Sequence, residues 1–199
     1  EGGRVQRFRP GFSKLPPLRR IGHEFDADHK AGCALARQLG WLMAAELRAH
    51  GVDVLVARVD VADEAAVATG VAATLAHFGR IDFCAANAGI GGGAPFAEMT
   101  TEKWRRVTTV NLDAVFWTFR EVAKHMLARA AAGDAGGSLV VTSSTSAIHG
   151  APRNQAYAAS KAAVQAMIRG LAVEYAQYGI RANAILPGWI ATDMTAALQ

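Results

Sequence analysis

Short runs of branched apolar residues alternate along this chain with longer segments of helical periodicity. The apolar runs cover residues 52–61, 81–86, 138–144 and 180–186, and each has the length of a β-strand. A segment of more than ten residues separates each run from the next, which suits the long crossovers that join parallel strands. The repeating order of helix and strand therefore predicts an α/β fold with a doubly wound parallel sheet.

The predicted helices lie before and between these runs. They cover residues 35–50, 63–78, 100–131 and 155–178. Asp63 is a suitable N-cap for the second helix, and Thr100 or Thr101 caps the third. Gly51, Gly79 and Gly179 follow three of the helices and are expected to end them.

A glycine-rich stretch, residues 89–94, follows the strand predicted at 81–86 and matches a GxGxxA pattern. In dinucleotide-binding proteins such a pattern opens a helix whose N-terminus holds phosphate. Here Pro95 and Phe96 follow directly, and no helical periodicity begins. The sequence therefore predicts a mobile loop at 89–94 and not a phosphate cradle.

The N-terminal segment differs from the rest of the chain in charge and in pattern. Residues 1–37 hold 8 Lys/Arg and 4 Asp/Glu, and residues 38–199 hold 13 of each. The net charge of +4 thus belongs to the beginning of the chain, and the neutral remainder argues against nucleic-acid binding. Residues 1–34 show no periodicity, so we expect mostly coil in a poorly ordered basic segment over 1–34, followed by an α/β domain over 35–199.

Other compositional features exclude several classes of protein. No apolar run reaches transmembrane length, and no hydrophobic segment follows the basic N-terminus as in a secretory signal, so a cytoplasmic protein without a membrane partner is expected. The two cysteines, Cys33 and Cys84, indicate no disulfide framework, and Cys84 is expected to be a buried reduced thiol. The six histidines are dispersed, and no metal site is predicted.

Tyr157 and Lys161 form the pair with the clearest chemical meaning. Residues four apart lie on one face of a helix, so the lysine ammonium is expected near the tyrosine phenol. A nearby positive charge favours the phenolate and lowers the tyrosine pKa from about 10 toward neutrality. Such a tyrosine can exchange a proton with an alcohol or a carbonyl. Ser144, at the end of the strand predicted at 138–144, can direct its hydroxyl at the same substrate oxygen.

Taken together with other short motifs, this pair resembles the short-chain dehydrogenase/reductase family over about residues 44–194. Each motif alone has an ordinary alternative as a strand end, a cap or a turn. The ordered set favours the family and consists of Asp60-Val61, Asn87-Ala88-Gly89, Asn111, Ser144, Tyr157 with Lys161, and Pro187-Gly188-Trp189-Ile190-Ala191-Thr192.

The resemblance implies a Rossmann-like NAD(P)-dependent oxidoreductase that interconverts an alcohol and a carbonyl by hydride transfer. Tyr157 would be the general acid/base, Lys161 would lower the tyrosine pKa and bind the nicotinamide ribose, and Ser144 would orient the substrate oxygen. Asn111 would hold a water on a freed backbone carbonyl, so an irregularity is expected there in the helix at 100–131. The implied cofactor-binding residues are Asp60, Val61, Asn87, Gly89, Tyr157, Lys161, Ile190 and Thr192.

The resemblance also implies a small-molecule alcohol or carbonyl as substrate and a homo-oligomer, either a dimer or a tetramer. It leaves the substrate open, and it leaves the choice between NAD and NADP open as well. The residues expected to shape the substrate pocket lie in the loops 90–98 and 145–156.

The chain departs from the family pattern at both ends, so the sheet is expected to be incomplete at both. Residues 1–43 contain no strand followed by a glycine-rich turn that would hold a pyrophosphate, and Asp26 is a weak candidate for a ribose-binding acid. The chain stops at Gln199, before the family's substrate lid. It is then either a fragment or frame-shifted product, or a degenerate relative that acts as an oligomeric partner. For the chain as given we expect weak cofactor binding, with a dissociation constant near or above about a millimolar.

Overall fold

The computed structural model describes residues 13, 24 and 27–188. The described residues divide into two compact units, one of residues 59–188 and one that contains residues 27–58. None of the described helices is both long and apolar enough to cross a membrane.

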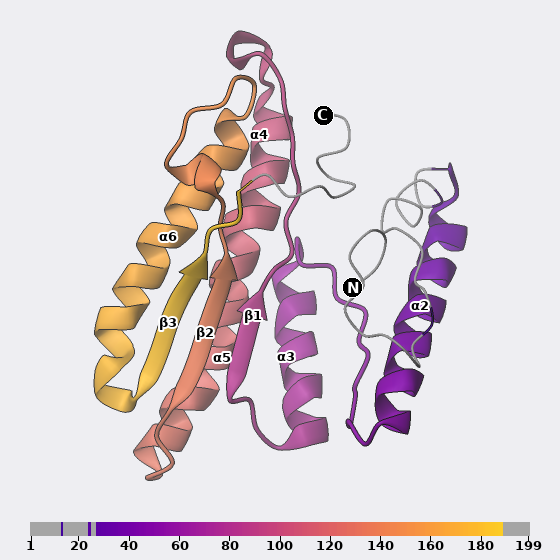
Figure 1. Cartoon of the computed structure of the whole chain (residues 1–199), viewed down its shortest axis with the longest axis vertical. Coiled ribbons are helices and arrows are strands. Elements are labelled where there is room, and N and C mark those ends of the chain that lie inside the picture. The colour runs from indigo at the N-terminus through magenta and orange to yellow at the C-terminus, as the bar shows by residue number, and fades with distance from the viewer. Residues whose placement is uncertain (1–12, 14–23, 25–26, 189–199) are drawn as a thin grey trace. The chain divides into compact units, whose positions relative to one another are not determined.

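The larger unit contains a parallel β-sheet, which confirms the predicted fold class. Its strands are β1 (Phe83–Ala86), β2 (Gly137–Thr142) and β3 (Ile180–Ile185), in the order β1-β2-β3 (Figure 1). Both pairings are parallel. Each strand is slightly shorter than its apolar run: β1 begins two residues later than predicted, and β2 and β3 end before residues 143 and 186.

Helices connect these strands as the periodicity predicts. α3 (Glu64–Phe78) begins after Asp63, whose carboxylate accepts hydrogen bonds from the backbone N–H groups of Ala65 and Ala66 at 2.9 and 3.2 Å. It ends at Gly79, which adopts the left-handed conformation with φ 75°. α6 (Gln155–Tyr175) continues into a 3-10 turn, Ala176–Tyr178, before a second left-handed residue, Gly179.

The helix predicted over residues 100–131 is interrupted at the expected place. α4 (Thr101–Thr108) and α5 (Ala114–Ala131) are separated by a π-helical turn, η2 (Thr109–Asp113), which contains Asn111. The Thr100 hydroxyl caps α4 by accepting a hydrogen bond from the Lys103 N–H. The structure therefore confirms the predicted irregularity at Asn111.

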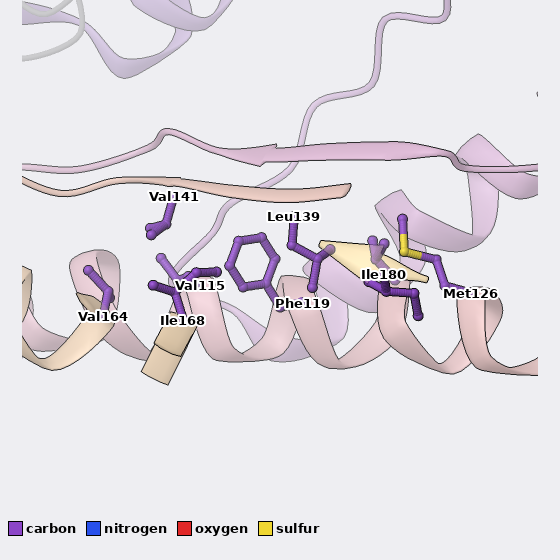
Figure 2. Packing of buried hydrophobic residues seen from close by; sticks show 9 residues of the cluster. Val115, Phe119, Met126, Leu139, Val141, Val164, Ile168 and Ile180 are labelled. Carbon is purple, nitrogen blue, oxygen red and sulfur yellow. The ribbon is translucent and has the colours of Figure 1, made fainter. Parts of the chain in front are cut away.

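The apolar core lies between the sheet and the pair of helices α5 and α6 (Figure 2). Strands β2 and β3 contribute alternate residues to it, as expected for strands with one face toward helices. Its fully buried members are Val115, Phe119, Val122, Met126, Leu139, Val141, Val164, Ile168 and Ile180.

The smaller unit differs from expectation in two places. α2 (His29–Ala49) begins six residues before the predicted start at residue 35, so the prediction of coil was wrong for residues 29–34. The Asp28 carboxylate explains the earlier start, because it accepts hydrogen bonds from the Lys30 and Ala31 N–H groups at 2.8 and 3.2 Å.

The predicted strand at 52–61 was also wrong, since these residues form no strand in the structure. The Val54 carbonyl accepts a hydrogen bond from the Arg48 guanidinium and not from a neighbouring strand. A β-strand exists only where a partner strand satisfies its backbone groups. Apolar composition alone therefore did not make a strand of this segment.

Candidate active site

The residues predicted to be catalytic lie on three elements of the larger unit. Ser144 follows the last residue of β2 by two positions, Tyr157 and Lys161 lie on the first two turns of α6, and Asn111 lies in η2. Strand ends at the carboxyl edge of a parallel sheet are where such folds bind ligands. The structure brings Lys161 and Asn111 together beside Gly89, and Tyr157 lies next to Lys161.

Lys161 is almost completely buried, with 4% of its surface exposed. Its Nζ donates a hydrogen bond to the Thr142 carbonyl at 2.7 Å and lies 5.6 Å from the centroid of the Tyr157 ring. Burial lowers the pKa of the Lys161 ammonium below its ordinary value. Tyr157 and Lys161 therefore lie side by side on one face of α6, as predicted, and Lys161 is the buried member of the pair.

Gly89 occupies a position where a side chain would crowd this group. A Cβ added to Gly89 would lie 3.3 Å from Lys161 Nζ and 3.4 Å from Asn111 Oδ1. The absence of a side chain thus lets the backbone after β1 approach both polar groups closely. A small residue at this point keeps open the space beside the ammonium.

Asn111 is fully buried, and its side chain makes three hydrogen bonds. Its Oδ1 accepts one from the Ile90 N–H at 2.8 Å, and its Nδ2 donates to the Ile90 carbonyl at 3.0 Å and to Ser160 Oγ at 3.1 Å. The side chain therefore connects η2 to the loop after β1 and to the second turn of α6. The loop at 89–94, predicted to be mobile, is fixed at Ile90 by these bonds.

Ser144 has an extended backbone conformation, with φ −164°, and the N–H groups of both neighbouring residues are hydrogen-bonded. The Ser143 N–H donates to the Ile185 carbonyl at 2.8 Å, and the Thr145 N–H donates to the Pro187 carbonyl at 3.0 Å. Ser144 Oγ accepts a hydrogen bond from the Ser146 N–H at 3.1 Å. That bond leaves the hydroxyl proton of Ser144 available to another acceptor.

The other predicted residues divide into three groups. The Asn87 Oδ1 accepts a hydrogen bond from Thr142 Oγ1 at 2.8 Å, which places Asn87 beside the end of β2. The Asp60 carboxylate accepts a local bond from the Ala62 N–H at 3.0 Å, in the turn with Val61 that precedes α3. Asp26, Ile190 and Thr192 lie outside the described residues.

Sequence reasoning missed two polar residues at this site, Ser143 and Gln165. Ser143 Oγ donates a hydrogen bond to the Lys161 carbonyl at 2.8 Å and accepts one from Gln165 Nε2 at 2.9 Å. A signal was present, because Gln165 is four residues after Lys161 and therefore shares its helix face. Among the described residues, no group of three or more His, Cys, Asp and Glu side chains could hold a metal ion.

Comparisons with known proteins place this geometry in a family. The family model described as short chain dehydrogenase matches residues 22–199. Versicolorin reductase 1 of Aspergillus parasiticus is 33% identical over 167 residues, which cover 83% of this chain and 61% of that protein.

Two solved structures give the same result. The crystal structure of levodione reductase superposes with a TM-score of 0.72 at 40% identity, covering 78% of this chain and 59% of the other. NAD+-bound xylitol dehydrogenase superposes with a TM-score of 0.70 at 33% identity, covering 77% and 57%. The chain thus spans about three-fifths of the length of these relatives. By its family match and by these likenesses, the chain belongs to the short-chain dehydrogenase family.

Proposed function

We propose that this chain carries the acid–base half of an NAD(P)-dependent oxidoreductase that interconverts an alcohol and a carbonyl, with Tyr157 as the general acid/base. The observation that carries this proposal is the buried Lys161 ammonium, held by the Thr142 carbonyl 5.6 Å from the Tyr157 ring centroid. Within the described residues the Tyr157 hydroxyl makes no hydrogen bond, so it remains available to a substrate.

The proton transfer follows from these positions. In the reducing direction Tyr157 donates its phenolic proton to the carbonyl oxygen, and in the oxidising direction its phenolate takes the proton of the alcohol. The Lys161 ammonium stabilises the phenolate electrostatically, because a fixed positive charge in a site of low polarity interacts strongly with a developing anion. The Ser144 hydroxyl donates a hydrogen bond to the same substrate oxygen.

The side chains around Lys161 fit a nicotinamide cofactor. An ammonium has three donors, and one of them is used by the Thr142 carbonyl, which leaves two for ribose hydroxyls. Gly89 leaves room beside Nζ that a Cβ would fill. A bound cofactor would supply or accept the hydride, and NAD+ in the related xylitol dehydrogenase supports NAD or NADP as the group. Asp60, Val61, Asn87, Ile190 and Thr192 remain proposed contacts of the cofactor.

A second candidate function is association without catalysis. Phe116 on α5 is 46% exposed, and the Arg120 guanidinium lies over its ring at 5.1 Å. Val173 on α6 is more exposed still. Exposed apolar side chains on these two helices are consistent with the proposed homo-oligomer, a dimer or tetramer.

A cytoplasmic location of the protein also stays a prediction.

The substitution Tyr157→Phe tests the catalytic proposal. In an active form of the protein the substitution removes one oxygen, so turnover of a panel of alcohols and carbonyls should fall by about 10²-fold or more. Circular dichroism and thermal unfolding should be unchanged. The matched control is Tyr178→Phe in the 3-10 turn after α6, which should keep wild-type turnover. Retention of more than about a tenth of the rate in Tyr157→Phe would refute the role of Tyr157.

Fluorescence titration with NADH and NADPH separates the two candidate functions. We expect dissociation constants near or above about a millimolar for the 199-residue chain, and saturation in the low micromolar range would contradict this expectation. Oligomers measured by light scattering in a wild-type chain that neither binds cofactor nor turns over would favour the association function.

A further inference from the structure

Ser143 is a buried polar residue that none of the steps above uses. Only 2% of its surface is exposed, and it lies between the end of β2 and Ser144. Its hydroxyl contacts α6 twice, at the Lys161 carbonyl and at Gln165 Nε2. The neighbour of Ser144 is thus attached to the same helical turn that carries Lys161.

Chemistry fixes the direction of both hydrogen bonds. A carbonyl has no proton, so the Ser143 hydroxyl must donate its single proton to Lys161 O, at 2.8 Å. The serine oxygen can then only accept a hydrogen bond, and it accepts one from the Gln165 side-chain NH2 group at 2.9 Å. Gln165 therefore holds the Ser143 hydroxyl in the orientation that binds Lys161.

These contacts mean that Lys161 is held at both ends by consecutive residues of one strand end. Its ammonium donates to the Thr142 carbonyl at 2.7 Å, and its own main-chain carbonyl accepts from Ser143. A lysine side chain has about four rotatable bonds, so it loses much conformational entropy when its ammonium is held in one place. Fastening both of its ends to residues 142 and 143 defines where the ammonium lies relative to Ser144.

We propose that Ser143 and Gln165 are positioning residues, which set the depth of the Lys161 ammonium beside Tyr157 and its place relative to Ser144. The catalytic meaning of this inference rests on the proposed function, but the positioning itself does not. Gln165 contributes no atom to the Tyr157–Lys161 contact, so it acts through Ser143.

The surroundings of Lys161 provide a direct readout. The ammonium donates to the Thr142 carbonyl and lies beside Gly89, whose other polar neighbour is Asn111 in η2, and none of these three residues carries a charge. Among the described residues, the titratable group in contact with it is the Tyr157 phenol on its own helix. Burial, which lowers the Lys161 pKa, is therefore the property that the titration of this lysine reports.

The experiment uses the full chain with lysine labelled at Cε with carbon-13. The chain has five lysines, and a Lys161→Arg variant identifies the Lys161 resonance. In the wild type its titration midpoint should lie below those of the other four. In Ser143→Ala and in Gln165→Met it should move up by about half a pH unit or more, because the ammonium is no longer held at depth.

Matched controls and a rescue complete the design. Ser138→Ala removes another buried serine from the opposite end of β2, and Gln177→Met removes an exposed glutamine after α6. Both should leave the Lys161 midpoint unchanged, and Ser143→Thr, which keeps the hydroxyl, should restore it. If Ser143→Ala does not fold, Gln165→Met decides the question by itself. A wild-type midpoint in a folded Gln165→Met variant would overturn the inference.

This outcome is distinguishable from failure of the proposed function. Movement of the Lys161 midpoint, together with retained turnover in Tyr157→Phe, would support the positioning and refute the catalytic proposal. Turnover that depends on Tyr157, with a Lys161 titration midpoint that stays the same in both variants, would support the catalytic proposal and refute the positioning. Where turnover is measured, both variants should lower kcat about tenfold or more at constant KM for the alcohol or carbonyl, because they displace a catalytic group and not that substrate.

Discussion

Removal of the Asn111 side chain is the perturbation whose effect the structure defines best. In Asn111→Ala the loop after β1 loses both hydrogen bonds at Ile90, and α6 loses the bond at Ser160. The residue is fully buried, so water cannot simply replace the amide. The substitution therefore removes the hydrogen-bond partner of three groups: the Ile90 N–H, the Ile90 carbonyl and the Ser160 hydroxyl.

The expected cost follows from those three groups. Each net hydrogen bond contributes about 1 kcal/mol, and a buried polar group left without a partner costs about 1–3 kcal/mol. Ser160 Oγ keeps its own bond to the Tyr157 carbonyl at 2.7 Å, so its share is at the low end. The sum is about 3–7 kcal/mol of unfolding free energy, a large part of the stability of an ordinary domain.

Urea unfolding followed by circular dichroism measures this quantity. The midpoint should fall with little change in the slope, since the surface exposed on unfolding is nearly the same. A double-mutant cycle with Ser160→Ala should give a coupling of about 0.5–1.5 kcal/mol for the Asn111–Ser160 bond. A loss below about 1 kcal/mol in Asn111→Ala would refute the reasoning, because it would mean that Ile90 finds other partners.

Two further predictions concern Cys84 and Gly89. Burial raises the pKa of the Cys84 thiol from 9.0 to about 11, so the thiol contributes stability that is complete below pH 9 and lost as the pH rises through about 11. The loss is at most roughly 2–3 kcal/mol, and it is measured as the difference between urea unfolding of the wild type and of Cys84→Ala across that range. Gly89→Ala should cost about 1 kcal/mol or more and weaken any cofactor binding, because the new Cβ would crowd Lys161 and Asn111. Its control is Gly91→Ala, where a Cβ would meet no atom within 4 Å, and equal effects at both glycines would count against the crowding.

The parts of the fold that the sequence predicts correctly are those set by local chemistry. Asp63 and Gly79 bound α3 as expected, because capping and the left-handed conformation depend on a few neighbouring residues. The start of α2 was readable from Asp28 in the same way, although the prediction placed it later. The segment at 52–61 was not readable, since a strand requires a partner that the segment itself does not specify.

The site shows the same division. Helical spacing correctly predicts that Lys161 and Tyr157 meet, and the family resemblance correctly predicts the irregularity at Asn111. Spacing does not show that the Lys161 side chain turns inward to the Thr142 carbonyl, because that contact depends on how closely α6 packs on β2. The partners of Asn111 at Ile90 were likewise hidden, as they are backbone groups of a distant loop.

The polar contacts of the site and the apolar core are two stretches of one interface. Side chains two apart on a strand share a face, so Ser143 continues the row of Leu139 and Val141 toward α6. On α6, Lys161 and Gln165 lie on the face of Val164 and Ile168, which belong to the same buried cluster as Leu139 and Val141 (Figure 2).

Apolar burial is non-directional and tolerates small sliding of a helix on a sheet, whereas a hydrogen bond weakens steeply when its geometry changes. The core therefore holds α6 against the sheet, and the bonds at Ser143 fix the position of Lys161 relative to the end of β2. A site that needs an ammonium at a fixed position requires directional hydrogen bonds, and these are supplied by a buried serine, Ser143, and a partly buried glutamine, Gln165, beside the apolar core.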